Sequence, residues 1–357
     1  MSAKRIDAVR KHFKNQNLDG LIVTDMNQIR YLTGFSGSAG LLILSGKQSH
    51  FLTDFRYTDQ ARKQVKGAKV RVVKSGLVSS LKDFPALNVT NRRYGFSSET
   101  TTVSLLKQLE RALPDCLLVA ANGVFTELSW VKDKSELASI VKAVDIADIA
   151  YERILNLVAP GIRERELAAE LEYQMIMLGS EKAAFETIVA SGFRSAMPHG
   201  AASEKKLKKG DFVTFDFGAT IGGYVSDMTR TVVVGKATSR QKKVYQTVLK
   251  AQLAGIRKIK AGVSGKAVDS VCRRIITRAG YGKKFGHGTG HGISIEVHSG
   301  PRLSPLSEDK LKVNNVVTVE PGIYISGWGG VRIEDDVVVT RTGCRVLNQA
   351  PKKLLEL

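Results

Sequence analysis

The sequence predicts a protein of two mixed domains, an α/β domain followed by a larger α+β domain in which helices cover an antiparallel sheet. Three observations favour this fold class. The chain has 357 residues, which is more than one ordinary hydrophobic core accommodates. Its first 125 residues alternate helical and strand-like patterns, as a compact α/β domain does. From residue 133 onward, long amphipathic helices are separated by short strands and glycine turns.

The elements of the first domain, residues 1–125, follow from the spacing of its apolar residues. A first amphipathic helix is indicated by four residues at helical spacing: Ile6, Val9, Phe13 and Leu18. Apolar runs predict strands at 20–24, 40–44, 51–53, 70–73 and 117–119. A helix is expected at 103–113, and 31–40 reads as a Gly/Ser-rich connection. This alternation predicts a mixed sheet.

The second domain, residues 133–357, begins after a boundary near 122–134. Asp133 followed by Glu136 is a capping-box pattern that opens a long helix, which Pro160 stops. Three more helices are predicted at 166–179, 242–260 and 268–280, with strands and glycine turns between them.

Composition narrows the class of protein. Apolar residues make up 43% and charged residues 25%, as in soluble globular proteins. No apolar run approaches the ~18 residues of a membrane helix, and the N-terminus lacks a secretory pattern, so we expect a cytoplasmic protein without a membrane partner. Three scattered cysteines form neither a disulfide framework nor a zinc motif. The net charge of +20 is diffuse, which favours a solvated surface over a nucleic-acid partner.

The segment 211–232 predicts a β-hairpin whose strands each carry an aspartate. A Gly-Gly dipeptide lies between two alternating runs, which is the pattern of a two-residue turn. With that turn, Thr229 faces Asp216 and Gly218 faces Asp227, so the two aspartates become diagonal neighbours on one face. Such carboxylates could hold a pair of metal ions, for which Gly218 leaves room. The alternative is two solvent-facing aspartates.

Residues 285–301 contain three histidines within twelve positions, His287, His291 and His298, spaced largely by glycines. Glycine lets the backbone approach a ligand closely, and neutral imidazole binds metals and transfers protons near neutral pH. The patterns of dinucleotide-binding loops, phosphate loops, His-Glu-x-x-His helices and Gly-x-Ser-x-Gly elbows are all missing from the sequence. An isolated histidine would more readily be structural, but the cluster favours a site.

Two glutamates further along complete the set. Glu320 ends a predicted strand, directly before a Pro-Gly turn. In the predicted strand 330–339, Arg332 and Glu334 share a face, so a structural salt bridge between them is the alternative to a site. The two acidic residues that follow are expected to be surface charges at the strand end: Asp335 and Asp336.

The potential ligands are four carboxylates and one imidazole: Asp216, Asp227, His291, Glu320 and Glu334. Carboxylates converging without a counter-ion would repel one another, whereas two divalent cations would cancel their charge. This hard, oxygen-rich set suits manganese and tolerates cobalt, iron or zinc. The sequence therefore predicts a hydrolytic centre with paired metal ions.

Together, these segments resemble the Xaa-Pro peptidase branch of the metallopeptidases with the pita-bread fold, which includes aminopeptidase P and prolidase. The resemblance runs essentially end to end. Five ligand positions recur in order with family spacing, while 31–40 and 53–57 look like the creatinase-like N-terminal domain of short bacterial members. It implies a pita-bread catalytic domain behind a smaller creatinase-like domain.

The resemblance also implies roles for individual residues. Asp216 and Asp227 would each bind metal, with Asp227 and Glu334 among the shared ligands. His291 would bind one ion, and Glu320 would be both ligand and proton shuttle.

Four further positions match substrate-side residues of the family. His199 matches its first substrate-side histidine, His287 the histidine lining the proline side, and His298 the one contacting the scissile carbonyl. Arg332 matches the arginine beside the last ligand. Two serines depart from the pattern, where the family has glycine and glutamate: Ser294 and Ser299. Neither removes a ligand, but both would change the fine packing of the substrate loop relative to the family.

The expected function is that of a dinuclear-metal exopeptidase, an Xaa-Pro aminopeptidase acting on peptides with proline in second position. A hydroxide bridging the ions would attack the scissile carbonyl, with Glu320, His298 and His199 as catalytic residues. The alternative within the class is an Xaa-Pro dipeptidase. Methionine aminopeptidase lacks the first domain, a creatinase-like enzyme would have lost the ligands, and a non-catalytic binding protein is a more distant alternative. The resemblance further implies a homodimer.

Overall fold

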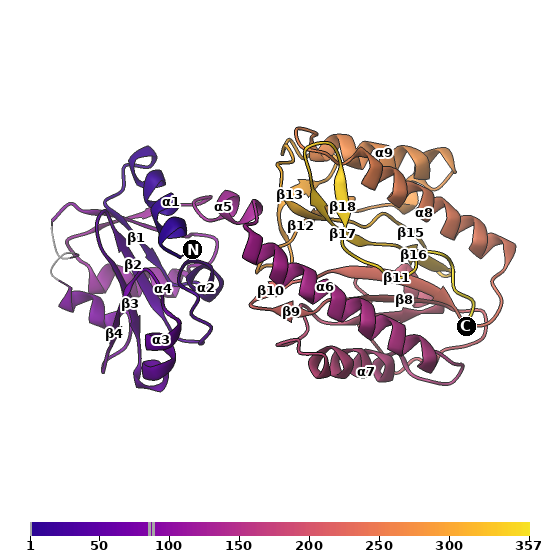
Figure 1. The fold of residues 1–357 in the computed structure, drawn as a ribbon, viewed down its shortest axis with the longest axis horizontal. Coiled ribbons are helices and arrows are strands. Elements are labelled where there is room, and N and C mark those ends of the chain that lie inside the picture. The colour runs from indigo at the N-terminus through magenta and orange to yellow at the C-terminus, as the bar shows by residue number, and fades with distance from the viewer. Residues whose placement is uncertain (1, 85–86, 88–89) are drawn as a thin grey trace. The chain divides into compact units, whose positions relative to one another are not determined.

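The computed structural model describes residues 2–84, 87 and 90–357, and the chain divides into two compact units, Met1–Leu128 and Ser129–Leu357. Figure 1 shows the helices and strands of each unit. None of the helices within the described residues has the length and apolar content needed to cross a membrane.

The first unit is built on a six-stranded sheet in the order β4-β3-β2-β1-β5-β6. Its strands are β1 Gly20–Val23, β2 Leu41–Ser45, β3 Ser49–Thr53, β4 Lys69–Val72, β5 Arg93–Phe96 and β6 Leu117–Ala120. Its helices are α1 Ser2–Asn15, α2 Met26–Thr33, α3 Thr58–Gln64 and α4 Val103–Ala112, with 3-10 turns η1 Phe55–Tyr57 and η2 Ser79–Asp83. The β1–β2 pair is antiparallel and the β1–β5 pair is parallel, so the predicted mixed sheet is confirmed.

The connection predicted at 31–40 begins inside a helix. Helix α2 runs to Thr33, and Gly34 ends it in the left-handed conformation at φ 85°. The cap is set by Asp25, whose side chain accepts a hydrogen bond from the backbone N–H of Gln28. Strand β5, which the sequence analysis did not predict, pairs with both β1 and β6.

Four long helices belong to the second unit: α6 Lys134–Ile154, α7 Glu164–Met177, α8 Ser239–Lys258 and α9 Gly265–Arg278. Helix α5 Thr126–Trp130 spans the division between the units, and 3-10 turns occur at η3 Leu155–Leu157, η4 Gly192–Ala196 and η5 Gly282–Lys284. The predicted capping box is present, because Asp133 accepts from the Glu136 N–H while Glu136 accepts from the Asp133 N–H. The helix ends as an α-helix at Ile154, before Pro160.

The strands of the second unit form several small sheets. A three-stranded sheet has the order β11-β8-β7, a five-stranded sheet the order β13-β12-β14-β17-β18, and two hairpins stand apart. The strands are β7 Ile188–Ser191, β8 Phe212–Phe217, β9 Thr220–Ile221, β10 Tyr224–Val225, β11 Met228–Val233, β12 Gly290–Gly292, β13 Ser299–Leu303, β14 Val316–Val319, β15 Gly322–Ile325, β16 Gly329–Arg332, β17 Asp335–Val339 and β18 Cys344–Val346. These strands pair antiparallel, as the α+β prediction requires.

The helices of this unit lie in two pairs with strands between them (Figure 1). Apolar side chains of α6 and α7, such as Tyr151 and Leu171, are buried with Phe215 and Phe217 of β8. Residues of α8 and α9, such as Tyr245 and Ile276, pack with β15 and β16. Strand β8, which carries Asp216, is therefore covered by apolar side chains of α6 and α7, and β15 and β16 by those of α8 and α9.

The aspartate hairpin has the predicted register. Thr229 pairs with Asp216, and the turn glycines, Gly222 and Gly223, both have positive φ, 61° and 83°. At Gly218 a Cβ would lie 1.8 Å from the Ser226 carbonyl oxygen, so the facing backbone by itself requires glycine at this position.

The predicted continuous strand 330–339 is also wrong. Strand β16 ends at Arg332 and pairs with β15, whereas β17 begins at Asp335 and pairs with β14. Glu334 lies at the break between two sheets. Asp335 and Asp336, predicted as surface charges, are both fully buried. Each has polar partners: Arg230, Gln252 and Lys352 donate to Asp335, and the Asp227 N–H donates to Asp336.

Candidate active site

A pocket of about 430 Å³ in the second unit collects the residues that the sequence analysis singled out. Its lining includes all nine: His199, Asp216, Asp227, His287, His291, His298, Glu320, Arg332 and Glu334. They come from separate elements, because Asp216 lies in β8, His291 in β12, and Glu320 directly after β14. A volume of this size is typical of small-molecule sites.

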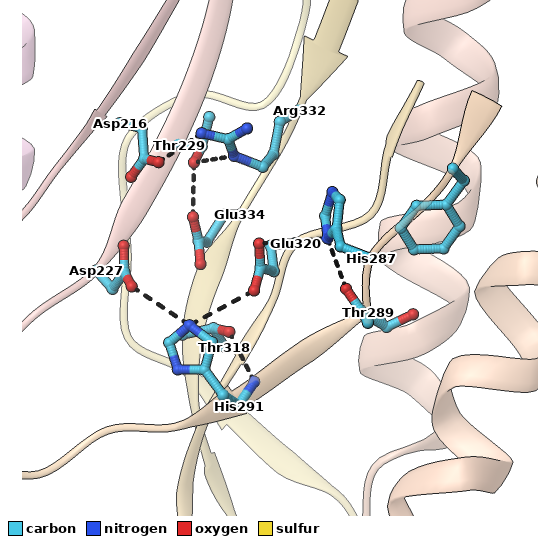
Figure 2. Close-up of polar contacts among 12 residues, drawn as sticks. Asp216, Asp227, Thr229, His287, Thr289, His291, Thr318, Glu320, Arg332 and Glu334 are labelled. Carbon is cyan, nitrogen blue, oxygen red and sulfur yellow. Dashed lines mark hydrogen bonds and ion pairs between the residues drawn. The ribbon is translucent and has the colours of Figure 1, made fainter. Parts of the chain in front are cut away.

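Three ligand atoms meet closely at the base of the site. Asp227, His291 and Glu334 each offer one atom within 4.8 Å of the others, and all three side chains are buried. The His291 Nε2 atom lies 3.7 Å from the Asp227 Oδ2 atom and 3.5 Å from the Glu320 Oε1 atom. Figure 2 shows the carboxyl groups of Asp227, Glu320 and Glu334 directed toward one space above the imidazole.

Asp216 is held differently from the other carboxylates. Its Oδ2 atom forms an ion pair with the Arg332 guanidinium, while its Oδ1 atom is buried and accepts no hydrogen bond within the described part of the chain. A buried carboxylate oxygen without a partner is costly, so this atom is available to a ligand.

Burial and crowding shift the proton equilibria of these groups. The pKa of Asp227 is raised well above its usual value by burial and then by the charge of Glu334. Burial and the charges of Glu320 and Asp216 likewise raise the pKa of Glu334. Burial raises the pKa of Glu320 to about 8, against the opposing charge of Arg332. Asp227, Glu320 and Glu334 therefore have too little positive charge around them to stay ionised easily.

His291 has the properties of a metal ligand. Burial lowers its pKa to about 4, with a further contribution from His298, so the ring is neutral at physiological pH. Its Nδ1 atom lies 3.1 Å from the Gly292 carbonyl oxygen, which orients the ring and leaves Nε2 toward the carboxylates. A neutral imidazole and a crowd of carboxylate oxygens fit divalent cations.

Thr229 and Tyr324 are two polar contributors that the sequence analysis did not identify as part of the site. The Thr229 hydroxyl donates to the Glu334 Oε2 atom at 2.6 Å and accepts from the Arg332 Nε at 3.0 Å. The Tyr324 hydroxyl lies 2.9 Å from Arg332 Nη1 and 2.8 Å from His287 Nε2. Side chains on one face of a strand recur at every second residue. The sequence could therefore have indicated Tyr324, four residues after Glu320, as a group on the same side.

His199 and His298 are exposed side chains that line the mouth of the pocket. The His298 ring centroid lies 4.5 Å from that of His291. Burial and then the charge of Arg302 lower the pKa of His298, which favours the neutral imidazole. His287 is more enclosed, and burial followed by the charge of Arg332 lowers its pKa to about 4.

Arg302 also lines the pocket and was missed in the sequence because it lies four residues beyond His298, outside any ligand pattern. Its backbone N–H donates to Asp309, whereas its exposed guanidinium has no hydrogen-bond or ion-pair partner within residues 2–84, 87 and 90–357. A cation without a partner in a pocket is suited to an anionic group of a ligand.

The fold and the cluster of acidic ligands define a metallohydrolase of the α+β class. The model of metallopeptidase family M24 matches residues 138–341, and that of the creatinase/prolidase N-terminal domain matches residues 5–128. The chain belongs to metallopeptidase family M24. Its predicted place among the Xaa-Pro peptidases with the pita-bread fold, behind a creatinase-like domain, is confirmed.

Named relatives cover the whole length of the chain. A solved Xaa-Pro dipeptidase from Bacillus anthracis is 42% identical, with a TM-score of 0.96 and full coverage of both chains. The Xaa-Pro dipeptidase of Pyrococcus horikoshii is 34% identical over 99% of each chain. A solved X-Pro aminopeptidase from Thermotoga maritima is 36% identical, with a TM-score of 0.90 and 99% coverage of both. The chain is a metallo-exopeptidase by family, and divalent metal ions are the cofactors that this family implies.

Proposed function

We propose that this protein is an Xaa-Pro dipeptidase that works with two divalent cations. The observation that carries the proposal is the pocket in which Asp227, His291 and Glu334 converge beside Glu320 and Asp216. Five carboxylates and two guanidiniums line it, a formal charge of −3 with all of them ionised, which one divalent ion would not offset and two would. The oxygen-rich set fits manganese best among the common divalent ions.

The protein's own groups would divide the work of hydrolysis. Bound cations would supply Lewis acidity, lowering the pKa of a water and polarising the scissile carbonyl. Glu320 would take a proton from the attacking water and give it to the leaving proline nitrogen. His298 and His199, at the mouth of the pocket, would donate hydrogen bonds to the carbonyl oxygen as charge develops on it.

His287 and Arg332 would form the proline side of the pocket. The two side chains are joined through the Tyr324 hydroxyl, so the neutral imidazole is fixed in one orientation. The Phe285 ring packs edge-on against His287, with centroids 5.1 Å apart. Phe285 does not itself line the pocket, so it supports the imidazole from outside, and His287 is the surface that would contact a pyrrolidine ring.

Dipeptide substrates fit the pocket better than longer peptides. In an Xaa-Pro dipeptide the carboxylate follows the proline directly, and the unpartnered Arg302 guanidinium can pair with it. A longer peptide places a neutral amide at that position. The dipeptidase relatives support the same conclusion. We therefore propose an Xaa-Pro dipeptidase in place of the Xaa-Pro aminopeptidase expected from the sequence. The homodimer and the cytoplasmic location stay predictions.

A metal-reconstitution assay tests the activity. Protein stripped with a chelator should lose hydrolysis of Ala-Pro, and added manganese should restore it. Measured per metal-loaded molecule, Glu320→Gln should lose turnover by about 10³-fold, as removal of an essential proton shuttle does. Equal activity of stripped and reloaded protein would refute the metal-dependent function.

The preference for dipeptides is tested by comparing Ala-Pro, Ala-Pro-amide and Ala-Pro-Ala. Arg302→Met should raise KM for Ala-Pro about tenfold or more and leave the amide unchanged, since only the dipeptide has the carboxylate. Arg345→Met, which removes an exposed arginine outside the pocket lining, is the matched control. Faster hydrolysis of Ala-Pro-Ala than of Ala-Pro by the unaltered protein would instead support the aminopeptidase.

A further inference from the structure

Arg273, in helix α9, connects that helix to the segment that carries His287. Its Nε and Nη2 atoms donate to the two Asp269 carboxylate oxygens, each at 2.9 Å. The same guanidinium donates to the carbonyl oxygens of Phe285 at 2.9 Å and His287 at 2.8 Å. It also lies over the Phe285 ring, 4.3 Å from the centroid. Arg273 does not line the pocket.

Asp269 contacts the same segment at Thr289, two residues beyond His287. Its side chain is buried, and its Oδ1 atom accepts from the Thr289 backbone N–H at 3.2 Å and from the Thr289 hydroxyl at 3.0 Å. Arg273 and Asp269 together therefore fix residues 285, 287 and 289 from one side. We call this pair the α9 clamp.

The clamped segment has little intrinsic rigidity. It alternates with glycines, and a Cβ at Gly286 would meet no atom within 4 Å in the part of the chain that the structure describes. Glycine-rich backbone loses more conformational freedom on folding than other backbone. The geometry of 285–289 consequently depends on contacts from outside, and the α9 clamp supplies four hydrogen bonds to its main chain or side chains.

Two groups of the proposed catalytic machinery depend on this segment. The His287 ring is held at Nε2 by Tyr324, so a shift of its backbone would break that contact. The Thr289 carbonyl oxygen accepts the Glu320 backbone N–H at 2.7 Å, which ties Glu320 to the clamped segment. Among the predicted ligands, Asp227 and Glu334 lie on other elements, whereas His291 follows the clamped segment in β12.

We propose that Arg273 is a positioning residue that sets His287 and Glu320 for turnover from outside the pocket. The inference rests on the proposed function, in which these two groups line the proline side and move the proton. Arginine is required because its planar fork makes two bonds to a carboxylate and two to carbonyl oxygens at once, which a lysine ammonium cannot do.

The other histidine segment provides an internal control. Arg194 donates to the buried Glu164 at 2.9 Å and to the Ala201 carbonyl oxygen at 2.6 Å, and so holds the segment that carries His199. Because this pair shares no residue with the α9 clamp, a change at Arg273 should leave 192–203 undisturbed.

The test compares Arg273→Lys and Arg273→Met with Arg274→Met, which removes the adjacent exposed arginine. Hydrogen exchange of 285–291 should rise about tenfold in both Arg273 variants, with 192–203 unchanged. The kcat for Ala-Pro, per folded and metal-loaded molecule, should fall about thirtyfold in both. Arg274→Met should match the unaltered protein.

Unaltered kcat per loaded molecule in Arg273→Lys, or unaltered exchange at 285–291, would overturn the proposal. If lysine alone preserved both, charge rather than the fork would be the cause, and the assigned role would be wrong. Should the unaltered protein fail to cleave Ala-Pro, the proposed function fails, while the exchange measurement still decides whether Arg273 fixes the segment.

Discussion

Glu334, directly before β17, and Asp335, the first residue of β17, are adjacent carboxylates that meet opposite electrostatic environments. Glu334 faces the pocket, where burial and the charges of Glu320 and Asp216 raise its pKa well above the usual value. Asp335 faces the interior, where burial would raise its pKa but Arg230 and Lys352 lower it instead. The folded chain provides the counter-ions for Asp335, whereas those for Glu334 must come from outside.

The largest effect in this comparison is expected from replacing Glu334, the carboxylate that faces the pocket. Glu334→Gln should abolish tight metal binding and reduce Ala-Pro hydrolysis by about 10³-fold or more. The metal-free variant should be more stable than the metal-free parent by about 1–2 kcal/mol, because one of the repelling charges is gone. Metal content and thermal unfolding of the stripped proteins measure the two effects. A less stable stripped variant would contradict this account.

Replacing Asp335, the carboxylate that faces the interior, should instead lower the free energy of unfolding. Asp335→Asn leaves the fully buried Arg230 without its partner at 2.8 Å, which should destabilise the protein by about 3–5 kcal/mol. Urea unfolding would measure the loss. Manganese bound per folded molecule should stay as in the parent, since the Asp335 carboxylate faces away from the ligands. Loss of metal without loss of stability would mean that the Asp335 carboxylate, and not a structural ion pair, serves the metal site.

The pocket carboxylates and Asp335 should also contribute to stability over opposite ranges of pH. Asp227, Glu320 and Glu334 have raised pKa values in the folded metal-free protein, so that state binds more protons than the unfolded chain. Their contribution is therefore present near pH 4–5 and is lost as the pH rises through about 8, the pKa of Glu320. Asp335 has a lowered pKa, so its contribution is lost only at acid pH.

Unfolding free energies of the stripped protein between pH 5 and 9 would reveal this slope. The decline should be shallower in Glu334→Gln and should disappear when manganese is bound. An equally steep decline in the metal-loaded protein would assign the slope to other groups.

The smallest effect is expected at the solvent-facing partner of Asp335. Lys352 donates to the Asp335 Oδ2 atom at 2.6 Å, but its side chain is 23% exposed, so solvent screens part of the interaction. Lys352→Met should cost about 1 kcal/mol and should be far milder than Asp335→Asn, because Arg230 and Gln252 remain as donors. Urea unfolding of both variants side by side would rank them, and an equal cost would contradict the ranking.

Local patterns in the sequence were informative where local geometry decides the structure. The Gly-Gly dipeptide determined the hairpin register, and with it the pairing of Thr229 with Asp216. Asp133 and Glu136 marked the start of α6 correctly, because a capping box is formed within four residues. The same reasoning failed for 330–339, since alternation does not reveal where a chain leaves one sheet for another.

The sequence by itself determined the two-domain class, the order of the acidic and histidine ligands and the family to which they belong, because those depend on residue types and spacing. Only the tertiary structure decided which carboxylate has a counter-ion. Glu334 and Asp335 are chemically alike and adjacent, but Thr229 donates to Glu334 and Arg230 donates to Asp335, each from an element distant in sequence. Burial and the positions of those partners, which no local pattern encodes, make one residue a candidate ligand and the other a structural ion.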